Sequence, residues 1–321
     1  MPAHVFVVDE INYDICTCKG IAGLTEGATP KIHQELLSRM AIIKSGDYVL
    51  FYVTGTKELR GVWKASGRPF FDETPVWENK TYPFRLRIES TEFSFKNSLR
   101  LNDVNDLRNH GKIWTWSLFR RNATNAMFSI SNSEYDILFQ EYLKINPFSI
   151  EESIVREPYR VIQPNLVKQL AYQRNGLPYE ASVMAMLHWS FVENEFQGIF
   201  GNYTDYISYV PTNLGTEIDV LLSFGNPKNA EQIMSYDVIE VKADRFDSKG
   251  LRQLIGYESW FIHKKVHGDM NMIRVTAIAK RFDDDVIDYV QKRKIFEGKE
   301  IKLFQYDVSD DRKLMLKTMI E

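Results

Sequence analysis

Short apolar runs with a two-residue period dominate the first half of the chain. Separated by turns rich in Gly, Thr and Asp, they predict strands at residues 4–8, 48–53, 59–65 and 82–88. In the last of these, Arg85 and Arg87 fall on the face opposite the apolar side chains. Helical spacing occurs at residues 30–43 and 134–144, and residues 16–30, rich in Gly and Thr, are expected to form a loop. Many strands with few helices predict a small β-barrel with helices.

In the second half, strand-like and helix-like patterns alternate. The expected strands are residues 215–222, 236–243, 273–279 and 300–308. The expected helices are one that opens at Glu180, residues 251–264 and residues 284–294. This alternation predicts an α/β arrangement with a mixed sheet. Pro147 must end the helix that precedes it, so we expect two domains, residues 1–147 and 148–321.

Two strands of the second half carry acids where a buried strand should have none. They are Asp219, within residues 215–222, and Glu240, within residues 236–243. Glu240 and Lys242 are two residues apart and therefore project from the same face of their strand. Charged side chains there are costly unless they pair or hold a metal. Glu240 and Lys242 alone could be an ordinary ion pair at a strand edge, which contributes little stability.

Asp219, followed about twenty residues later by Glu240-x-Lys242, resembles the core of the PD-(D/E)xK nucleases. Ile218 stands where that family usually has a proline. The resemblance implies a restriction-endonuclease-like mixed sheet flanked by helices. Residues 238–257 are also similar to archaeal mismatch-type nucleases.

Three flanking residues extend this resemblance. Glu180 lies in the helix before Asp219, where the family places an additional acid on the metal side. Gln253 and Tyr257, four residues apart on one helical face, resemble the motif that follows the catalytic strand in recombination-type and restriction-type members. The implied roles are completion of the metal shell for Glu180 and positioning of the scissile phosphate for Gln253 and Tyr257.

The resemblance also implies a metal cofactor. Asp219, Glu240 and the carbonyl of Val241 would bind Mg²⁺, for which Mn²⁺ could substitute, since hard oxygen ligands suit these ions. Lys242 would orient or deprotonate the attacking water and balance the charge that develops on the phosphate.

The first half resembles the EVE and YTH members of the PUA-like superfamily. The resemblance rests on residues 44–52, with Lys-x-Gly-Asp before an apolar strand, on residues 61–65, and on residues 129–138. It implies a domain that holds one nucleobase, often a modified one, in an aromatic pocket. A base has two π faces, and stacking on an aromatic ring contributes about 1–3 kcal/mol per base.

Aromatic side chains that could form this pocket are plentiful, although most aromatic residues build cores. The candidates are Trp63, Trp77, Tyr52, Trp114 and Trp116. Trp63 and Trp77 lead because both lie near bends that contain Gly or Pro. Arg120 and Arg121 are candidate phosphate contacts.

Composition narrows the class of protein. Hydrophobic residues make up 44% and charged residues 26% of the 321 residues, which is ordinary globular composition. The net charge of −3 gives no general polycation signal, so a nucleic-acid surface must be a local patch. Cys16 and Cys18 are expected to be reduced structural thiols. No apolar run approaches a membrane span and no signal-peptide pattern opens the chain, so we expect a cytoplasmic protein without a membrane partner.

Together the two resemblances imply a modification-dependent, type IV-like DNA restriction endonuclease. It would flip and bind a modified base in double-stranded DNA, with a cytosine derivative as the expected base. A homodimer is expected because cutting both strands needs two active sites. The alternatives are a repair or mismatch-type endonuclease and a non-catalytic DNA or RNA modified-base reader. Residue spacing determines neither the base nor the cleavage position.

Overall fold

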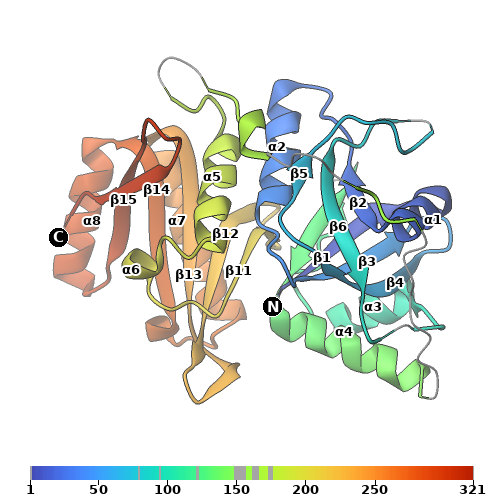
Figure 1. The fold of residues 1–321 in the computed structure, drawn as a ribbon. Helices are drawn as coiled ribbons and strands as arrows, with labels where there is room; N and C mark the ends of the chain where they lie inside the picture. Colours follow the sequence, from blue (N-terminus) through green and yellow to red (C-terminus); the bar gives the residue numbers. More distant parts are fainter. Residues whose placement is uncertain are drawn as a thin grey trace. The chain divides into compact units, whose positions relative to one another are not determined.

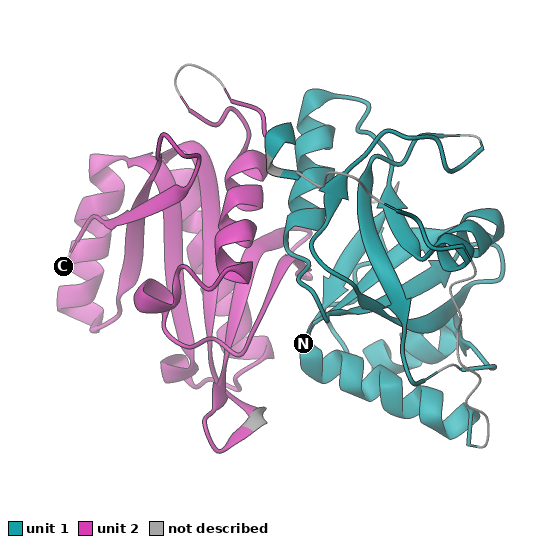
Figure 2. Ribbon diagram, in the orientation of Figure 1, with its two compact units in different colours: residues 1–169 teal, residues 170–321 magenta. Residues whose placement is uncertain are grey.

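The computed structural model describes residues 2–78, 80–93, 95–120, 123–147, 157–160, 166–172 and 176–320. It divides into two compact units, residues 1–169 and 170–321 (Figure 2). Each unit is a mixed α+β fold, the first built on a curled sheet and the second on a mixed sheet with helices, which confirms the predicted fold class. No helix in these ranges is long and apolar enough to cross a membrane.

Among its described residues, the first unit contains an eight-stranded sheet that curls around a core (Figure 1). Its main path runs β10-β1-β3-β4-β6-β2, with β5 beside β6 and β7 beside β4. β1 and β3 are parallel, and the other pairs are antiparallel. The strands are β1 (Ala3–Val8), β2 (Ile21–Leu24), β3 (Tyr48–Val53), β4 (Glu58–Ala65), β5 (Phe70–Phe71), β6 (Phe84–Ser90), β7 (Leu99–Arg100) and β10 (Met127–Ile130). β8 (Phe119–Arg120) and β9 (Ala123–Thr124) form a separate ladder.

The predicted loop at residues 16–30 is wrong over its first half. Helix α1 (Glu10–Lys19) continues through both cysteines, and β2 follows it directly. Asp9 starts α1 by accepting a hydrogen bond from the backbone N–H of Asn12, and Gly20, at φ 64°, ends it. The other helical segments of this unit are α2 (Pro30–Ala41), α3 (Leu101–Asn109), α4 (Asn132–Ile145) and the 3₁₀ turn η1 (Leu166–Gln169).

A fully buried polar group explains the Lys-x-Gly-Asp sequence before β3. The Asp47 carboxylate accepts a hydrogen bond from the Lys44 backbone N–H at 2.9 Å and lies 3.1 Å from Nε2 of His4 on β1. The other ring nitrogen of His4 is 2.9 Å from Oγ of Ser129 on β10. All three side chains are buried. This Ser–His–Asp arrangement therefore ties three parts of the sheet together and is closed to a substrate.

The segment that follows α4 returns to the first unit where the structure describes it. The backbone N–H groups of Glu157 and Tyr159 donate to the carbonyls of Cys18 and Lys19, at 3.0 and 2.8 Å. The Tyr159 hydroxyl donates to the carboxylate of Asp72 at 2.5 Å. Residues 157–160 thus form a strap across the first unit.

The second unit is a six-stranded sheet in the order β11-β12-β13-β14-β15-β16, as far as its residues are described. β13, β14 and β15 are parallel, and the outer pairs are antiparallel. The strands are β11 (Asp205–Pro211), β12 (Glu217–Asn226), β13 (Asn229–Phe246), β14 (Ile273–Phe282), β15 (Ile301–Val308) and β16 (Leu314–Thr318). The helical segments are α5 (Glu180–Val192), α6 (Gln197–Phe200), α7 (Ser248–Lys264), η2 (Met270–Met272) and α8 (Asp284–Glu297). The expected elements are all present, whereas the edge strands β11 and β16 were not expected.

Candidate active site

The pairing of β12 with β13 brings Asp219 beside Glu240. The two strands are antiparallel, with Val220 opposite Ile239, so the next position along the ladder sets the two acids side by side. The Asp219 carboxylate accepts a hydrogen bond from the backbone N–H of Val241 at 2.7 Å. Two acids twenty-one positions apart in the sequence therefore occupy one place in the sheet.

Lys242 joins a third acid to this pair. Its Nζ atom lies 2.6 Å from Oε1 of Glu240 and 3.1 Å from Oε2 of Glu180, the first residue of α5. It also donates to the carbonyl of Val241 at 3.1 Å. Directly after Lys242 the pairing of β13 with β14 shifts register, an irregularity of the kind that re-aims side chains.

The acids of this cluster sit where charge is costly. Burial raises the pKa of Asp219 well above its usual range, and the charges of Glu240 and Glu180 raise it further. Burial also raises the pKa of Glu240, to about 7, although Lys242 opposes the shift. Burial lowers the pKa of Lys242, but the surrounding carboxylates outweigh it and the pKa ends above its ordinary value. The site therefore carries more buried negative charge than one ammonium balances.

Gln253 and Tyr257 lie beside the cluster and are bonded to each other. On α7, the Gln253 amide donates to the Tyr257 hydroxyl at 2.8 Å, and that hydroxyl donates to the carbonyl of Glu217 at 2.6 Å. Burial, and then the charge of Glu240, raise the pKa of Tyr257 to about 12. Tyr257 thus fastens α7 to β12 two residues before Asp219, a structural contact that the sequence pattern did not reveal.

The donor set fits a hard divalent cation. One oxygen of Glu240, Oε2, is buried without a hydrogen-bond partner among the described residues, and the raised pKa values of Asp219 and Glu240 show an unmet demand for positive charge. Across the described ranges no three His, Cys, Asp or Glu side chains form a ready metal cluster. In this arrangement the Lys242 ammonium bonds to Glu240 and to the Val241 carbonyl, two of the three expected metal ligands.

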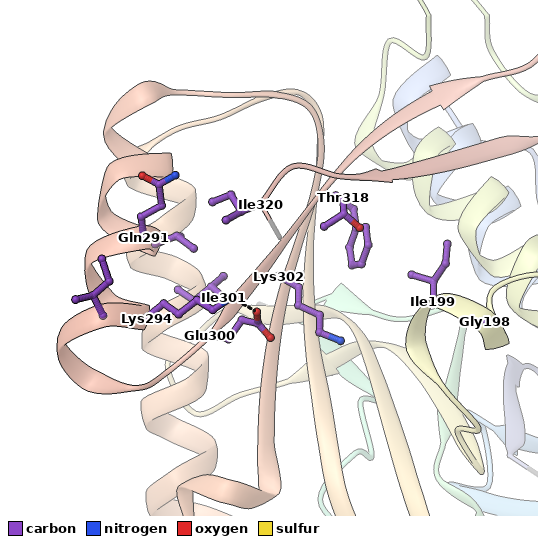
Figure 3. A pocket seen from close by; sticks show the side chains of 12 residues that line it. Gly198, Ile199, Gln291, Lys294, Glu300, Ile301, Lys302, Thr318 and Ile320 are labelled. Atoms are coloured by element: carbon purple, nitrogen blue, oxygen red, sulfur yellow. Dashed lines mark ion pairs between the residues drawn. The ribbon is translucent and has the colours of Figure 1, made fainter.

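A separate cavity of about 610 Å³ lies elsewhere in the second unit, beside α8, β15 and β16 (Figure 3). Its lining includes the ion pair between Lys294 and Glu300, at 3.2 Å, and Thr318 at the end of β16. None of the six predicted catalytic residues lines it.

In the first unit the candidate pocket aromatics have different surroundings. Tyr52 and Trp116 belong to the hydrophobic core. Trp114 is partly buried, and its backbone N–H donates to the Glu134 carboxylate. Trp77 is covered by Tyr82, with ring centres 4.8 Å apart, whereas Trp63 lines a cavity of about 750 Å³.

The two predicted phosphate contacts cannot be placed. Arg121 and the side chain of Arg120 lie outside the described residues.

Arg85 is a buried cation that the alternating pattern of β6 assigned to the polar face, and that assignment is wrong. It is 0% exposed. Its guanidinium lies 5.3 Å from the ring centre of Trp77 and 5.1 Å from that of Tyr159, and donates to the Tyr159 hydroxyl at 2.7 Å. The nearby Asp72 carboxylate is 3.5 Å away. The many aromatic residues around it in the sequence were the available signal.

Comparison with known proteins gives one family match. Residues 32–141 match the family model of the EVE domain, which confirms the expected EVE-type domain in the N-terminal part. No curated protein matches the chain.

Several solved structures are similar to parts of the chain. EndoMS in its complex with double-stranded DNA is 18% identical, with a TM-score of 0.23, over 30% of this chain and 34% of that one. A repair endonuclease from Pyrococcus abyssi is 15% identical, with a TM-score of 0.26, over 35% and 45%. The Mmi1 YTH domain in complex with RNA is 12% identical, with a TM-score of 0.32, over 47% and 84%. The chain thus spans about a third of the EndoMS chain, and none of these TM-scores reaches 0.5.

Proposed function

We propose that the second unit is a metal-dependent DNA endonuclease of the PD-(D/E)xK type. The observation that carries this proposal is the convergence of Asp219, Glu240 and Lys242 with Glu180 in one largely buried cluster. Asp219, Glu240 and the Val241 carbonyl would hold Mg²⁺, or Mn²⁺ in its place. The ion would stabilise charge on the phosphate and acidify a water.

The residues of the chain define the remaining roles. Because the carboxylates around it raise the pKa of Lys242, this ammonium stays protonated at neutral pH. It would therefore orient the attacking water and balance charge on the phosphate, in preference to acting as a base. Glu180, whose side chain is 43% exposed, is placed to hold a water at the solvent side of the cluster. Gln253 would position the scissile phosphate from α7.

We further propose that the first unit directs this nuclease to a modified base. The EVE match over residues 32–141 supports this role, because such a domain in the same chain as a nuclease site would couple recognition to cutting. The whole protein would then be a modification-dependent, type IV-like restriction endonuclease that captures a modified cytosine from double-stranded DNA. Cutting both strands requires two active sites, so the protein would act as a homodimer.

The test is cleavage of two DNAs of identical sequence, one unmodified and one fully substituted with 5-methyl- or 5-hydroxymethylcytosine, with Mg²⁺ or Mn²⁺. Cutting of the modified DNA alone is expected. Equal cutting of both, or faster cutting of a mismatched duplex, would contradict modification dependence and favour a repair nuclease. Binding without cutting in either metal would contradict the nuclease proposal.

A further inference from the structure

The cavity beside Trp63 has the dimensions and lining of a site for a small planar ligand. Its volume is about 750 Å³, within the usual range for small-molecule sites. Three aromatic side chains from separate parts of the first unit line it, namely Tyr13 of α1, Trp63 of β4 and Phe95. Two exposed cations, Lys96 and Arg100, line it as well.

Trp63 presents an unused hydrogen-bond donor in this lining. The residue is 3% exposed, and its indole N–H is buried without a partner among the described residues. A buried donor left unpaired costs about 1–3 kcal/mol, so such groups normally find an acceptor. A ligand acceptor in the cavity would supply it.

The backbone next to Trp63 is shaped to leave its ring edge open. Gly61, which also lines the cavity, has φ +118° at the irregularity where β4 pairs with β3. A Cβ atom at this position would lie 3.1 Å from Cδ1 and 3.6 Å from Nε1 of Trp63. Glycine is thus required both by the conformation and by access to the indole edge.

Tyr13 is held as a fixed wall of the same cavity. The guanidinium of Arg60 lies 5.1 Å from the centre of its ring. Arg60 is held in turn by Glu10 at 2.6 Å and Glu58 at 3.0 Å, so its charge is balanced within the protein. The cation therefore fixes the ring, and the charges of Lys96 and Arg100 remain to attract an anion.

We propose that this cavity binds a single nucleobase, with the phosphate of its nucleotide near Lys96 and Arg100. The aromatic side chains would contact the base, and its ring carbonyl or ring nitrogen would accept the N–H of Trp63. This inference rests on the proposed function of the first unit and assigns its base pocket to the Trp63 cavity. Trp77, by contrast, is covered by Tyr82 and Arg85.

The assignment is tested by photocrosslinking the full chain to DNA that contains one 5-iodocytosine, followed by mass spectrometric mapping. The expected crosslink falls on Trp63 or Tyr13. A crosslink confined to Trp77 or Tyr82 would overturn the Trp63 assignment and leave the proposed function standing. The absence of any crosslink to the first unit would overturn both.

A pair of variants gives an independent measurement. Trp63→Phe keeps an aromatic ring but removes the N–H, and Trp77→Phe is its matched control. In fluorescence anisotropy with one 5-hydroxymethylcytosine in the duplex, Trp63→Phe should weaken binding about tenfold, the loss of one hydrogen bond, and Trp77→Phe should have less effect. Thermal melting of each variant checks that it is folded. Folded Trp63→Phe with unchanged affinity would overturn the proposal.

Discussion

The Glu240 carboxylate and the Lys242 ammonium, two residues apart on β13, lie 2.6 Å apart, and the Glu240 side chain is fully buried. An exposed pair of this kind would contribute little stability. A buried one costs desolvation energy that well-packed apolar residues would avoid. Its retention beside Asp219, a second buried acid, therefore points to chemistry at this place and away from a purely structural role.

Removal of the carboxylate charge should abolish cutting. Asp219→Asn or Glu240→Gln should lower the cleavage rate at least about 10²-fold, since a metal ligand and its charge at the phosphate are lost. DNA affinity, which would reside in the first unit, should stay within a few-fold of the unchanged protein. Rates are measured on modified duplex with saturating Mg²⁺, and Asp288→Asn, an exposed acid of α8, is the matched control. Cleavage by Asp219→Asn at the control rate would refute the metal site.

Lys242→Ala separates two roles for the lysine. If the ammonium orients water while protonated, Lys242→Arg should keep measurable cleavage and Lys242→Ala should lose it. The pH–rate profile should show no requirement for a deprotonated lysine between about pH 7 and 9, because the carboxylates raise its pKa. A rate that climbs about tenfold per pH unit over that window, and that loses this slope in Lys242→Arg, would instead assign Lys242 as the base.

The buried acids should make the metal-free protein less stable as pH rises. Because burial raises the folded-state pKa of Glu240 from 4.5 to about 7, the folded protein binds more protons than the unfolded chain between these values. Its contribution to stability is therefore greatest below pH 4.5 and declines as pH rises through about 7. Urea unfolding in EDTA at about pH 5.5, 6.5 and 8 should show this decline, and Glu240→Gln should flatten it. An identical slope in Glu240→Gln would assign the effect to Asp219 or Asp237, whose pKa values burial also raises.

The Tyr257 hydroxyl should matter for stability and the Gln253 amide for catalysis. Tyr257→Phe removes the bond to the Glu217 carbonyl and should lower the free energy of unfolding by about 1 kcal/mol. Gln253→Ala leaves that bond in place and should lower the cleavage rate with little loss of stability. Urea unfolding and single-turnover cleavage of both variants distinguish the roles, and the reverse pattern would exclude this division.

Asp47 should stabilise the first unit more than its neighbours in the network. Asp47→Ala leaves His4 and the Lys44 N–H unpaired in a fully buried position, which should cost roughly 2–4 kcal/mol. Ser129→Ala removes a single bond and should cost about 1 kcal/mol. Thermal unfolding of both variants is the measurement. Equal melting temperatures would show that the His4–Asp47 contact is dispensable.

Sequence reasoning predicted the cluster where period and pairing sufficed. Glu240 and Lys242 share a strand face because the side-chain period is two, and antiparallel pairing of β12 with β13 brings Asp219 alongside. The pattern could not show where the Lys242 ammonium points, since its flexible side chain selects among three carboxylates by geometry. Nor could it show that Tyr257 bonds to a backbone carbonyl.

In the first unit the pattern failed where polar residues are buried. Alternation along β6 assigned Arg85 to solvent, but tertiary contacts with Trp77 and Tyr159 cover it. The Gly- and Thr-rich run after Cys16 outweighed the capping signal of Asp9 and hid α1. The candidate aromatics were correctly recognised as mostly core for Tyr52 and Trp116, yet hydrophobicity alone cannot tell a core ring from a ring that lines a cavity.

The strap of residues 157–160 bears on how such a domain could be exchanged between proteins. Tyr159 covers the buried guanidinium of Arg85 and bonds with Asp72, so these contacts belong to the fold of the first unit. A recombination event that joined the domain to a new partner directly after α4 would uncover a desolvated cation and the ring of Trp77 beside it. A transplantable module must therefore carry the strap, and its evolutionary unit extends beyond the last helix of its sheet.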